Sequence, residues 1–157
     1  DGMISLNGCG FKVISLGKEI GRASGIKMCY AALTKGTMTL HTAVLLAAEQ
    51  LGLLEELLAE FSYSQPQTLI NIKKRVPRLP ADSKRWIGEM EQIVKTFLDI
   101  GVTGKFHIGA AEIFSLLAST PFANETRATM DLNRGVFEAI RVYVKHLSSQ
   151  KKQYDDY

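Results

Sequence analysis

The pattern of hydrophobic and polar positions along the chain predicts helices almost throughout. The strongest signal runs from Ser24 to Gln50, where apolar or small residues recur in alternating steps of four and three. This spacing places them on one face of a single long helix, with Ser24 as its N-cap and Gly52 as the residue that ends it. The residues of this face are Ile26, Tyr30, Leu33, Thr37, Leu40, Val44, Ala47 and Leu51.

Five shorter helices are predicted after the long one. Their apolar residues follow the helical period, and glycine, proline or capping residues lie near their ends. The last of them is expected to have Asn124 as its cap. The predicted ranges are Leu53 to Phe61, Gln67 to Arg75, Ala81 to Leu98, His107 to Ser119 and about Thr126 to Leu147. We therefore expect an all-α fold, a helical bundle with one long central helix.

One short β-strand is predicted ahead of the helices. Residues 11–16 alternate imperfectly between apolar and polar positions, are rich in residues that favour strands, and lie between Gly10 and Gly17. No internal repeat and no Walker-type phosphate loop interrupts the pattern.

Composition narrows the classes of protein that fit. The chain has 157 residues, 46% of them hydrophobic, and a net charge of +3, which suits a folded domain and argues against disorder. No stretch approaches the ~18 uncharged apolar residues of a membrane span, so no membrane partner is expected. The 19 basic residues are interleaved with 16 acidic ones, so nucleic acid is not an expected partner either.

The cysteines and histidines give no sign of a metal site. Cys9 and Cys29 lack the spacing of a disulfide framework or a metal cluster, so we expect buried free thiols in a reducing cytoplasm. We also expect no signal peptide, which favours a cytoplasmic location. Among His41, His107 and His146, none pairs with a second ligand at metal spacing. We expect His41 to be a hydrogen-bonded core or interface residue.

The turn that opens the long helix is the best candidate site. Small residues around Gly21 and Gly25 let a ligand approach the backbone, and free N–H groups at a helix start favour an anion. Lys27, in the first turn, can hydrogen-bond a substrate oxygen. Ser24 belongs to the same turn, and Tyr30 and Thr34 lie about 60° and 20° around the helix from Lys27. The alternative is that Lys27 only extends its charge into water from an amphipathic helix.

Two further charged groups are weaker candidates for a site. The run Lys73-Lys74-Arg75 is most simply a solvated surface, with contact to a phosphate as the alternative. Glu89 lies beside Trp86 on a helix that is expected to be partly buried, so a role at a site stays open for it.

At the candidate turn the sequence resembles the β-hydroxyacid dehydrogenase superfamily, which includes 6-phosphogluconate and 3-hydroxyisobutyrate dehydrogenases. The residues that carry the resemblance are Leu6 to Ile14, Gly21 to Gly36 with Lys27, and Trp86 to Glu91. The similarity is greatest to the helical C-terminal domain of NAD-binding phosphogluconate-dehydrogenase-like proteins, and it extends from about residue 6 to residue 147.

The resemblance implies an NAD(P)-dependent oxidoreductase that acts on a small hydroxy acid or related anion. By this likeness Lys27 is the catalytic acid/base. From their places beside it in the turn and along the helix, we expect Ser24, Tyr30 and Thr34 to bind the substrate. Residues 1–20 would end an N-terminal nucleotide-binding domain, residues 21–147 would form a helical substrate-binding and dimerisation domain, and residues 148–157 a polar tail. The chain would form a homodimer through its helical domain.

The nucleotide-binding domain itself is expected upstream of this chain. No Gly-x-Gly-x-x-Gly motif occurs in the sequence, so NAD or NADP would be bound mainly by that domain, and this chain alone would be inactive. Ala31 stands where the family commonly has an asparagine, and Gly88 where it has a lysine. Two alternatives remain open: a non-enzymatic helical dimerisation or interaction module, and an imine-reducing enzyme.

Overall fold

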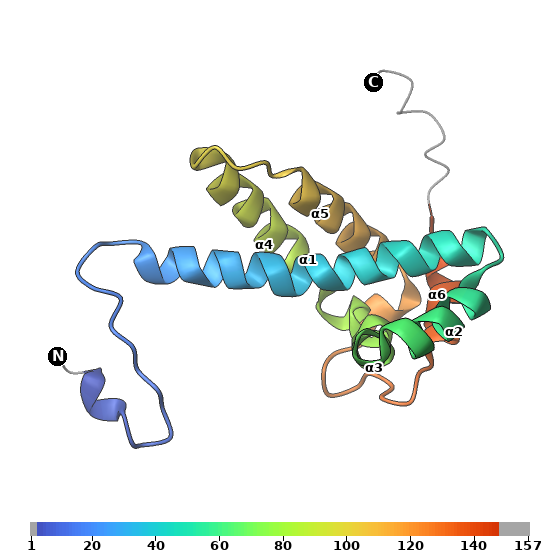
Figure 1. Cartoon of the computed structure of the whole chain (residues 1–157), viewed down its shortest axis with the longest axis horizontal. Helices are drawn as coiled ribbons and strands as arrows, with labels where there is room; N and C mark the ends of the chain where they lie inside the picture. The colour runs from blue at the N-terminus through green and yellow to red at the C-terminus, as the bar shows by residue number, and fades with distance from the viewer. Residues whose placement is uncertain (1–2, 148–157) are drawn as a thin grey trace.

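The computed structural model describes residues 3–147. Within this range the chain forms six α-helices, three short 3-10 helices and no sheet, which confirms the predicted all-α class (Figure 1). The α-helices are α1 (Arg22–Gln50), α2 (Leu54–Ser64), α3 (Pro66–Arg75), α4 (Pro80–Asp99), α5 (Lys105–Ala118) and α6 (Val136–Val144). The 3-10 helices are η1 (Ile4–Leu6), η2 (Val76–Arg78) and η3 (Pro121–Asn124).

The long helix α1 begins earlier than the sequence indicated. Gly21 has a φ of 95°, a left-handed conformation that glycine adopts at little cost, and its carbonyl oxygen accepts the first helical hydrogen bond from the Gly25 N–H at 2.8 Å. Ser24, the predicted N-cap, is instead the third residue of the helix, so that prediction is wrong. The cap fails because Gly21 already makes the turn into the helix.

The end of α1 is as predicted. Gly52 has a φ of 71°, and its N–H donates to the Glu49 carbonyl oxygen at 3.0 Å. The Leu53 N–H donates to the Ala48 carbonyl oxygen at 2.8 Å. This pair of hydrogen bonds is the Schellman motif, which satisfies carbonyl groups that the last helical turn leaves free.

The core of the body forms where α4, α5 and α6 pack against the second half of α1. Helices α4 and α5 make the most extensive contact, and Figure 1 shows them side by side, above α1 in this view and running behind it. Five side chains from these four helices have no exposed surface at all, and they anchor the body: Leu45, Met90, Ile93, Phe114 and Ile140.

The segment η2 is tied to the last helix by hydrogen bonds. In a continuous helix the Val76 carbonyl oxygen would accept from the residue at position 80, but Pro80 has no N–H. The buried Tyr143 hydroxyl donates to that oxygen at 3.0 Å, and Arg134 donates to the neighbouring Pro77 carbonyl oxygen at 3.3 Å. Burial also raises the pKa of Tyr143. These contacts fix the segment that carries Arg78.

The predicted strand at residues 11–16 does not form. A strand needs a neighbouring strand to pair with, and within residues 3–147 this segment has only an isolated bridge from Phe11 to Asn7. The Asn7 side chain instead accepts from the Val13 N–H at 2.7 Å and donates to the Val13 carbonyl oxygen at 3.2 Å. It thereby occupies both backbone groups that a pairing strand would use.

The last helix is shorter than predicted. Helix α6 begins at Val136, and residues 126–135 form turns, so Asn124 does not cap it. Thr129 accepts from the Thr126 N–H at 2.9 Å, and Asp131 accepts from the Asn133 N–H at 2.8 Å. Local bonds of this kind compete with helix formation, which explains the delayed start.

The periodic face of α1 that dominates the sequence lies open in the structure. Leu33 and Leu40 are 70% and 63% exposed, whereas Leu45, on the opposite side, is completely buried. At 100° per residue, Leu40 and Val44 each lie about 160° around the helix from the buried Thr42. Helix α1 therefore packs through a second side, built from less conspicuous residues, and leaves its most regular apolar face uncovered within residues 3–147.

Both cysteines are free and exposed, so their predicted burial is wrong. Cys9 lies in the segment before α1, and Cys29 lies in the first half of α1 and lines the cavity between α1 and α5. Neither position is packed against the core.

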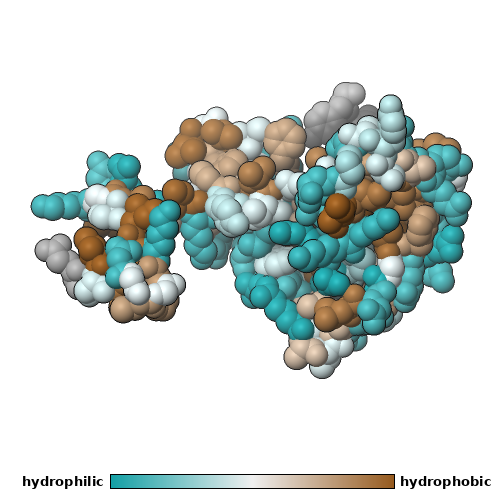
Figure 2. All heavy atoms as spheres, turned by 60° about the horizontal axis from the view of Figure 1, so that its bottom comes forward, coloured by the Kyte–Doolittle hydropathy of each residue, from teal (hydrophilic) through white to brown (hydrophobic). Residues whose placement is uncertain are grey.

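The N-terminal segment stands apart from the helical body. Residues 3–21 extend from the start of α1 and form a separate lobe in both views (Figures 1 and 2). The assignment of residues 1–20 to the end of another domain stays a prediction. The predicted polar tail, residues 148–157, lies outside the described residues.

Candidate functional site

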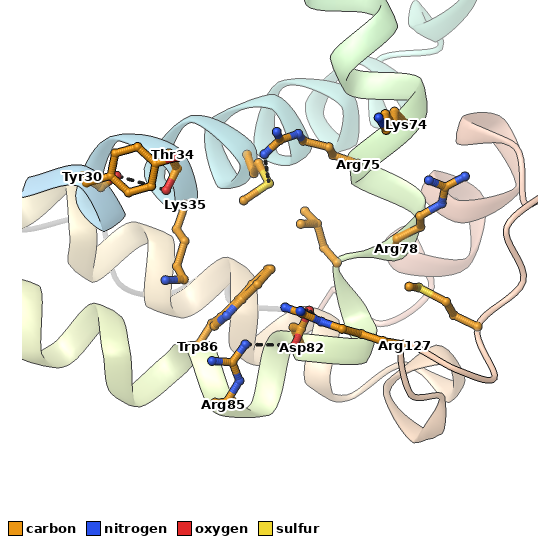
Figure 3. A pocket seen from close by; sticks show the side chains of 13 residues that line it. Tyr30, Thr34, Lys35, Lys74, Arg75, Arg78, Asp82, Arg85, Trp86 and Arg127 are labelled. Carbon is orange, nitrogen blue, oxygen red and sulfur yellow. Dashed lines mark hydrogen bonds and ion pairs between the residues drawn. The ribbon is translucent and has the colours of Figure 1, made fainter. Parts of the chain in front are cut away.

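A pocket of about 500 Å³ lies between α1, α3, η2, α4 and the loop that follows η3 (Figure 3). Its walls come from positions spread over about one hundred residues of sequence. The lining residues are Tyr30, Thr34, Lys35, Met38, Lys74, Arg75, Arg78, Leu79, Asp82, Arg85, Trp86, Arg127 and Met130. Cationic side chains are the largest group among them.

Helix α1 supplies one wall. Tyr30, Thr34 and Met38 follow each other at a spacing of four residues, which places them on one face of the helix. The Thr34 hydroxyl donates to the Tyr30 carbonyl oxygen at 3.0 Å, so its proton is used within the helix. Toward a ligand, this hydroxyl therefore offers an acceptor oxygen.

Helix α4 supplies the opposite wall, where two carboxylates hold three cations. Glu89 accepts from Lys35 at 2.5 Å and from Arg85 at 2.8 Å. Asp82 contacts Arg85 and Arg127, each at 3.0 Å. Lys35 is only 14% exposed, so its ion pair with Glu89 is the best shielded of the four from solvent. This network fixes the cations on that side of the pocket.

The same wall carries Trp86, which lies among these cations. The Lys35 ammonium is 5.5 Å from the centre of the indole ring, and the Arg85 guanidinium is 5.7 Å from it. Trp86 also makes an edge contact with the buried Phe114, with ring centres 5.3 Å apart. The indole thus connects the pocket wall to the core.

The third wall carries cations without acidic partners. Lys74, Arg75 and Arg78 come from the end of α3 and from η2, and Figure 3 shows them across the pocket from Asp82 and Arg85. Arg75 approaches the Met38 sulfur at 3.8 Å, and Arg78 donates to the Leu132 carbonyl oxygen at 2.8 Å. Within residues 3–147 none of the three has a carboxylate oxygen within 4.0 Å.

Two of the four predicted site residues meet at this pocket. Tyr30 and Thr34 line it, whereas Lys27 and Ser24 are exposed and do not. Lys27 lies about 4.5 Å before Tyr30 along the helix axis and on the same side of α1. It is therefore at the edge of the pocket region, one turn nearer the start of the helix.

One wall of the pocket was partly indicated by the sequence, and the residues of the other walls were mostly not. The run Lys73-Lys74-Arg75 indicated a cationic cluster, and the structure directs Lys74 and Arg75 into the pocket lining while Lys73 stays outside it. No pattern in the sequence indicated that Arg78 and Arg127 line the pocket, because their positions depend on how η2 and the loop at residues 125–135 are held. In that loop Arg134 forms an ion pair with Glu125.

A second cavity, of about 750 Å³, lies on another side of α1, against α5. Its lining is mainly apolar and includes Leu33, Leu40, Phe106 and Ile113. His107 also lines it, and the buried Nδ1 of this ring has no hydrogen-bond partner among the described residues. The groove therefore joins the open face of α1 to exposed apolar side chains of α5.

The remaining candidate groups add no site. His41 is half-buried in α1, and burial lowers its pKa. No group of three or more potential metal ligands occurs within residues 3–147. In that same range, no helix has both the length and the apolar character that crossing a membrane requires.

Comparison with known proteins relates part of the chain to a family. Residues 48–117 match the family model of a domain of unknown function (DUF1932). The fold is similar to that of a conserved hypothetical protein from Sinorhizobium meliloti 1021, with a TM-score of 0.71 and 22% sequence identity. This likeness covers 90% of the present chain but 47% of the other, so the chain spans about half the length of that protein. No curated protein matches the chain.

Proposed function

We propose that the chain is the C-terminal, substrate-binding domain of an NAD(P)-dependent oxidoreductase of the β-hydroxyacid dehydrogenase type. The observation that carries this proposal is the match of residues 48–117 to DUF1932. DUF1932 is a C-terminal helical domain of NAD-binding 6-phosphogluconate dehydrogenase-like proteins. The substrate is a small hydroxy acid or related anion, and the protein acts in the cytoplasm.

The cofactor belongs to a domain upstream of this chain. The sequence has no Gly-x-Gly-x-x-Gly turn, the element that places a pyrophosphate at a helix N-terminus, so the residues present do not fit the cofactor by themselves. Residues 1–20 would then end the cofactor domain, and residues 21–147 would present the substrate to it. This chain alone would not catalyse the reaction.

Lys27 is the proposed acid/base. It is exposed near the start of α1, so its ammonium group is accessible to a ligand held between α1 and an adjoining domain. During oxidation of a hydroxyl group, Lys27 in its amine form would take the hydroxyl proton, and the hydride from the carbon would pass to NAD(P) bound by the upstream domain; reduction would reverse both transfers. Tyr30 and Thr34, further along the same side of α1, contact the remainder of the substrate.

The test of this role is the Lys27→Met substitution in the full-length protein that carries this chain. Acid–base catalysis usually contributes 10²–10⁴-fold, so turnover should fall by about that factor while folding is retained. The matched control is Lys84→Met, because Lys84 is also exposed on a helix but belongs to α4 and not to the side of α1 that carries Lys27. Turnover that Lys27→Met leaves unchanged would remove Lys27 from the mechanism.

A second copy of the chain is the proposed partner of the open face of α1. That face presents Leu33, Leu40 and Val44 to solvent, and the apolar cavity against α5 continues it. Contiguous apolar surface of this kind on a folded domain marks an interaction site. We therefore propose a homodimer through the helical domain.

The same surface also supports the alternative function, a non-enzymatic dimerisation or interaction module. The mass of the natively expressed polypeptide separates the two. A species of about 30 kDa or more has room for a cofactor domain at ~100–200 residues per domain. A native product of 17.4 kDa, the mass of this chain, would favour the module.

A further inference from the structure

One wall of the pocket beside α1 is a loop, whereas the other walls are mainly helical. Residues 126–133 follow η3, and Arg127 and Met130 from this loop line the pocket. The remaining lining residues belong to α1 or to the continuous run from α3 to α4. Figure 3 shows Arg127 at the end of the pocket that lies opposite Tyr30. The loop is therefore the wall that can move without displacing a helix.

The base of this loop is fixed inside the body. Glu125 and Arg134, at its two ends, form an ion pair, and the Arg134 side chain is only 5% exposed. The Arg134 guanidinium also lies 3.5 Å from the centre of the Phe122 ring and donates to the Pro77 carbonyl oxygen at 3.3 Å. Separating the two partners of such a pair would leave an uncompensated buried charge, which is strongly unfavourable. The two ends of the loop are therefore held together.

Between these ends the loop buries little surface but has a shape of its own. Every residue from 126 to 133 is exposed except Met130, which is half-buried at the pocket. The Met130 N–H donates to the Thr126 carbonyl oxygen at 2.8 Å, and the Asn133 N–H donates to the Asp131 carboxylate at 2.8 Å. Since these hydrogen bonds lie within the loop, it can move as a unit without losing them.

Two polar contacts attach the loop to the rest of the pocket. Arg127 donates to the Asp82 carboxylate at 3.0 Å, and Arg78 donates to the Leu132 carbonyl oxygen at 2.8 Å. Arg127 is 68% exposed, and ion pairs at the surface contribute little stability because water replaces them readily. When Arg127 leaves, Asp82 keeps Arg85 as a partner at 3.0 Å. Opening of the loop therefore leaves no carboxylate unpaired.

We propose that residues 126–133 are a gate of the pocket, which turns about its fixed base when Arg127 leaves Asp82. Opening uncovers the end of the pocket opposite Tyr30 and gives a small molecule a route in and out, as mobile loops do at many active sites. The movement is a property of this chain alone. Its role in admitting substrate rests on the proposed function, which places the substrate in this pocket.

The direct test measures the position of the gate. Ala128→Cys and Glu91→Cys, both at exposed positions, carry nitroxide labels in a chain in which Cys9 and Cys29 are changed to serine. Double electron–electron resonance then gives the distribution of distances between the gate and α4. The natural ion pair should hold one dominant distance. Asp82→Asn should enlarge a longer-distance population by about two- to fivefold, the effect of losing a surface ion pair.

Two further variants separate the gate from its surroundings. Asp99→Asn is the matched control, because Asp99 also forms an ion pair along α4, with Lys95 at 2.7 Å, but lies at the other end of that helix. It should leave the distance distribution unchanged. Arg78→Gln removes the bond to the Leu132 carbonyl oxygen and should enlarge the open population by about two- to tenfold. This second variant keeps the test valid if Asp82→Asn does not fold.

Trypsin cleavage after Arg127 gives an independent measure of opening. When opening and closing are fast relative to cleavage, the rate of cleavage follows the population of the open form. Mass spectrometry of the fragments should therefore show faster cleavage after Arg127 in Asp82→Asn and in Arg78→Gln. Cleavage after Lys95, within α4, should not change in either variant.

Three results would overturn the proposal. One is a distance distribution that neither Asp82→Asn nor Arg78→Gln changes, and another is an equal change in Asp99→Asn. The third is an equal rise in cleavage after Arg127 and after Lys95, which would mean that the whole domain opens. Lys27→Met should leave both measurements as they are, so failure of the gate and failure of the catalytic role are separate outcomes.

Discussion

The two sides of α1 that flank its buried stripe differ in chemistry and in origin. On one side, Tyr30, Thr34 and Met38 meet cations from α3, η2, α4 and a distant loop, and together they form the cationic pocket. On the other, the helix presents an apolar face that continues into a groove along α5. One side is assembled by tertiary structure, whereas the other is encoded within a single helix.

A strongly periodic apolar face need not be the face that packs into the core. The most regular apolar spacing in the sequence predicts a face that needs a partner, and the structure leaves that face uncovered within residues 3–147. The stripe that actually holds the body together includes Thr39 and Thr42, whose hydroxyls donate to helix carbonyl groups and so can be buried. The hydrophobic period identified the helix, but it did not identify which side of the helix packs against the core.

The largest expected effect comes from comparing leucines on the two faces. Leu45→Ala removes a completely buried side chain and should lower the free energy of unfolding by about 2–5 kcal/mol. Leu40→Ala, on the open face, should change the stability of the monomer by less than about 0.5 kcal/mol. Urea unfolding at low protein concentration measures both. Equal losses would mean that the open face is part of the core.

The open face is expected to control self-association. Leu40→Glu would place a charge in the proposed homodimer interface and should raise the dimer dissociation constant by about 10–100-fold, because burying an unpaired charge is costly. Sedimentation equilibrium of the chain measures this constant. The matched control is Ile70→Glu, since Ile70 is exposed on α3 and outside both cavities. A dimer that tolerates Leu40→Glu would contradict the proposed partner.

A smaller effect is expected where the pocket side is anchored to α6. Tyr143→Phe removes the hydrogen bond to the Val76 carbonyl oxygen and should cost about 0.5–1.5 kcal/mol. Burial raises the pKa of Tyr143 above its usual 10, so the unfolded chain releases this proton first as the pH rises. Stability from this group is therefore complete below about pH 10 and declines above it.

The matching measurement is urea unfolding between pH 8 and pH 11 for the natural chain and for Tyr143→Phe. We expect the alkaline loss of stability to be smaller in the variant, because the phenylalanine has no proton to release. Identical pH profiles would show that Tyr143 is not the group responsible.

Much of the fold was predictable because its signals are local. Helix α3 ends before Pro77, because proline cannot continue a helix. Helix α1 ends at Gly52, which adopts a left-handed conformation. Two predictions were wrong: a strand at residues 11–16 and an early start of the last helix. Side chains such as Asn7 and Thr129 form local hydrogen bonds with the backbone there. Propensity alone does not reveal these competing bonds.

The pocket was less predictable than the fold. Tyr30 and Thr34 could be placed from helical spacing relative to Lys27, and the run at residues 73–75 indicated cations. Arg78 and Arg127 could not be placed, since their positions depend on the contacts that fix η2 and the loop after η3. A site assembled from four regions of sequence has no single motif by which to recognise it.

The central claim is that the two sides of α1 bind different partners. The most direct test is an amide chemical-shift map of the chain during a titration with a small hydroxy acid, 3-hydroxybutyrate, at a fixed protein concentration. The account predicts perturbations at Thr34, Arg75 and Arg78, and none at Leu33 and Phe106 in the apolar groove. Perturbations concentrated in the groove, or spread evenly over both sides of α1, would contradict it.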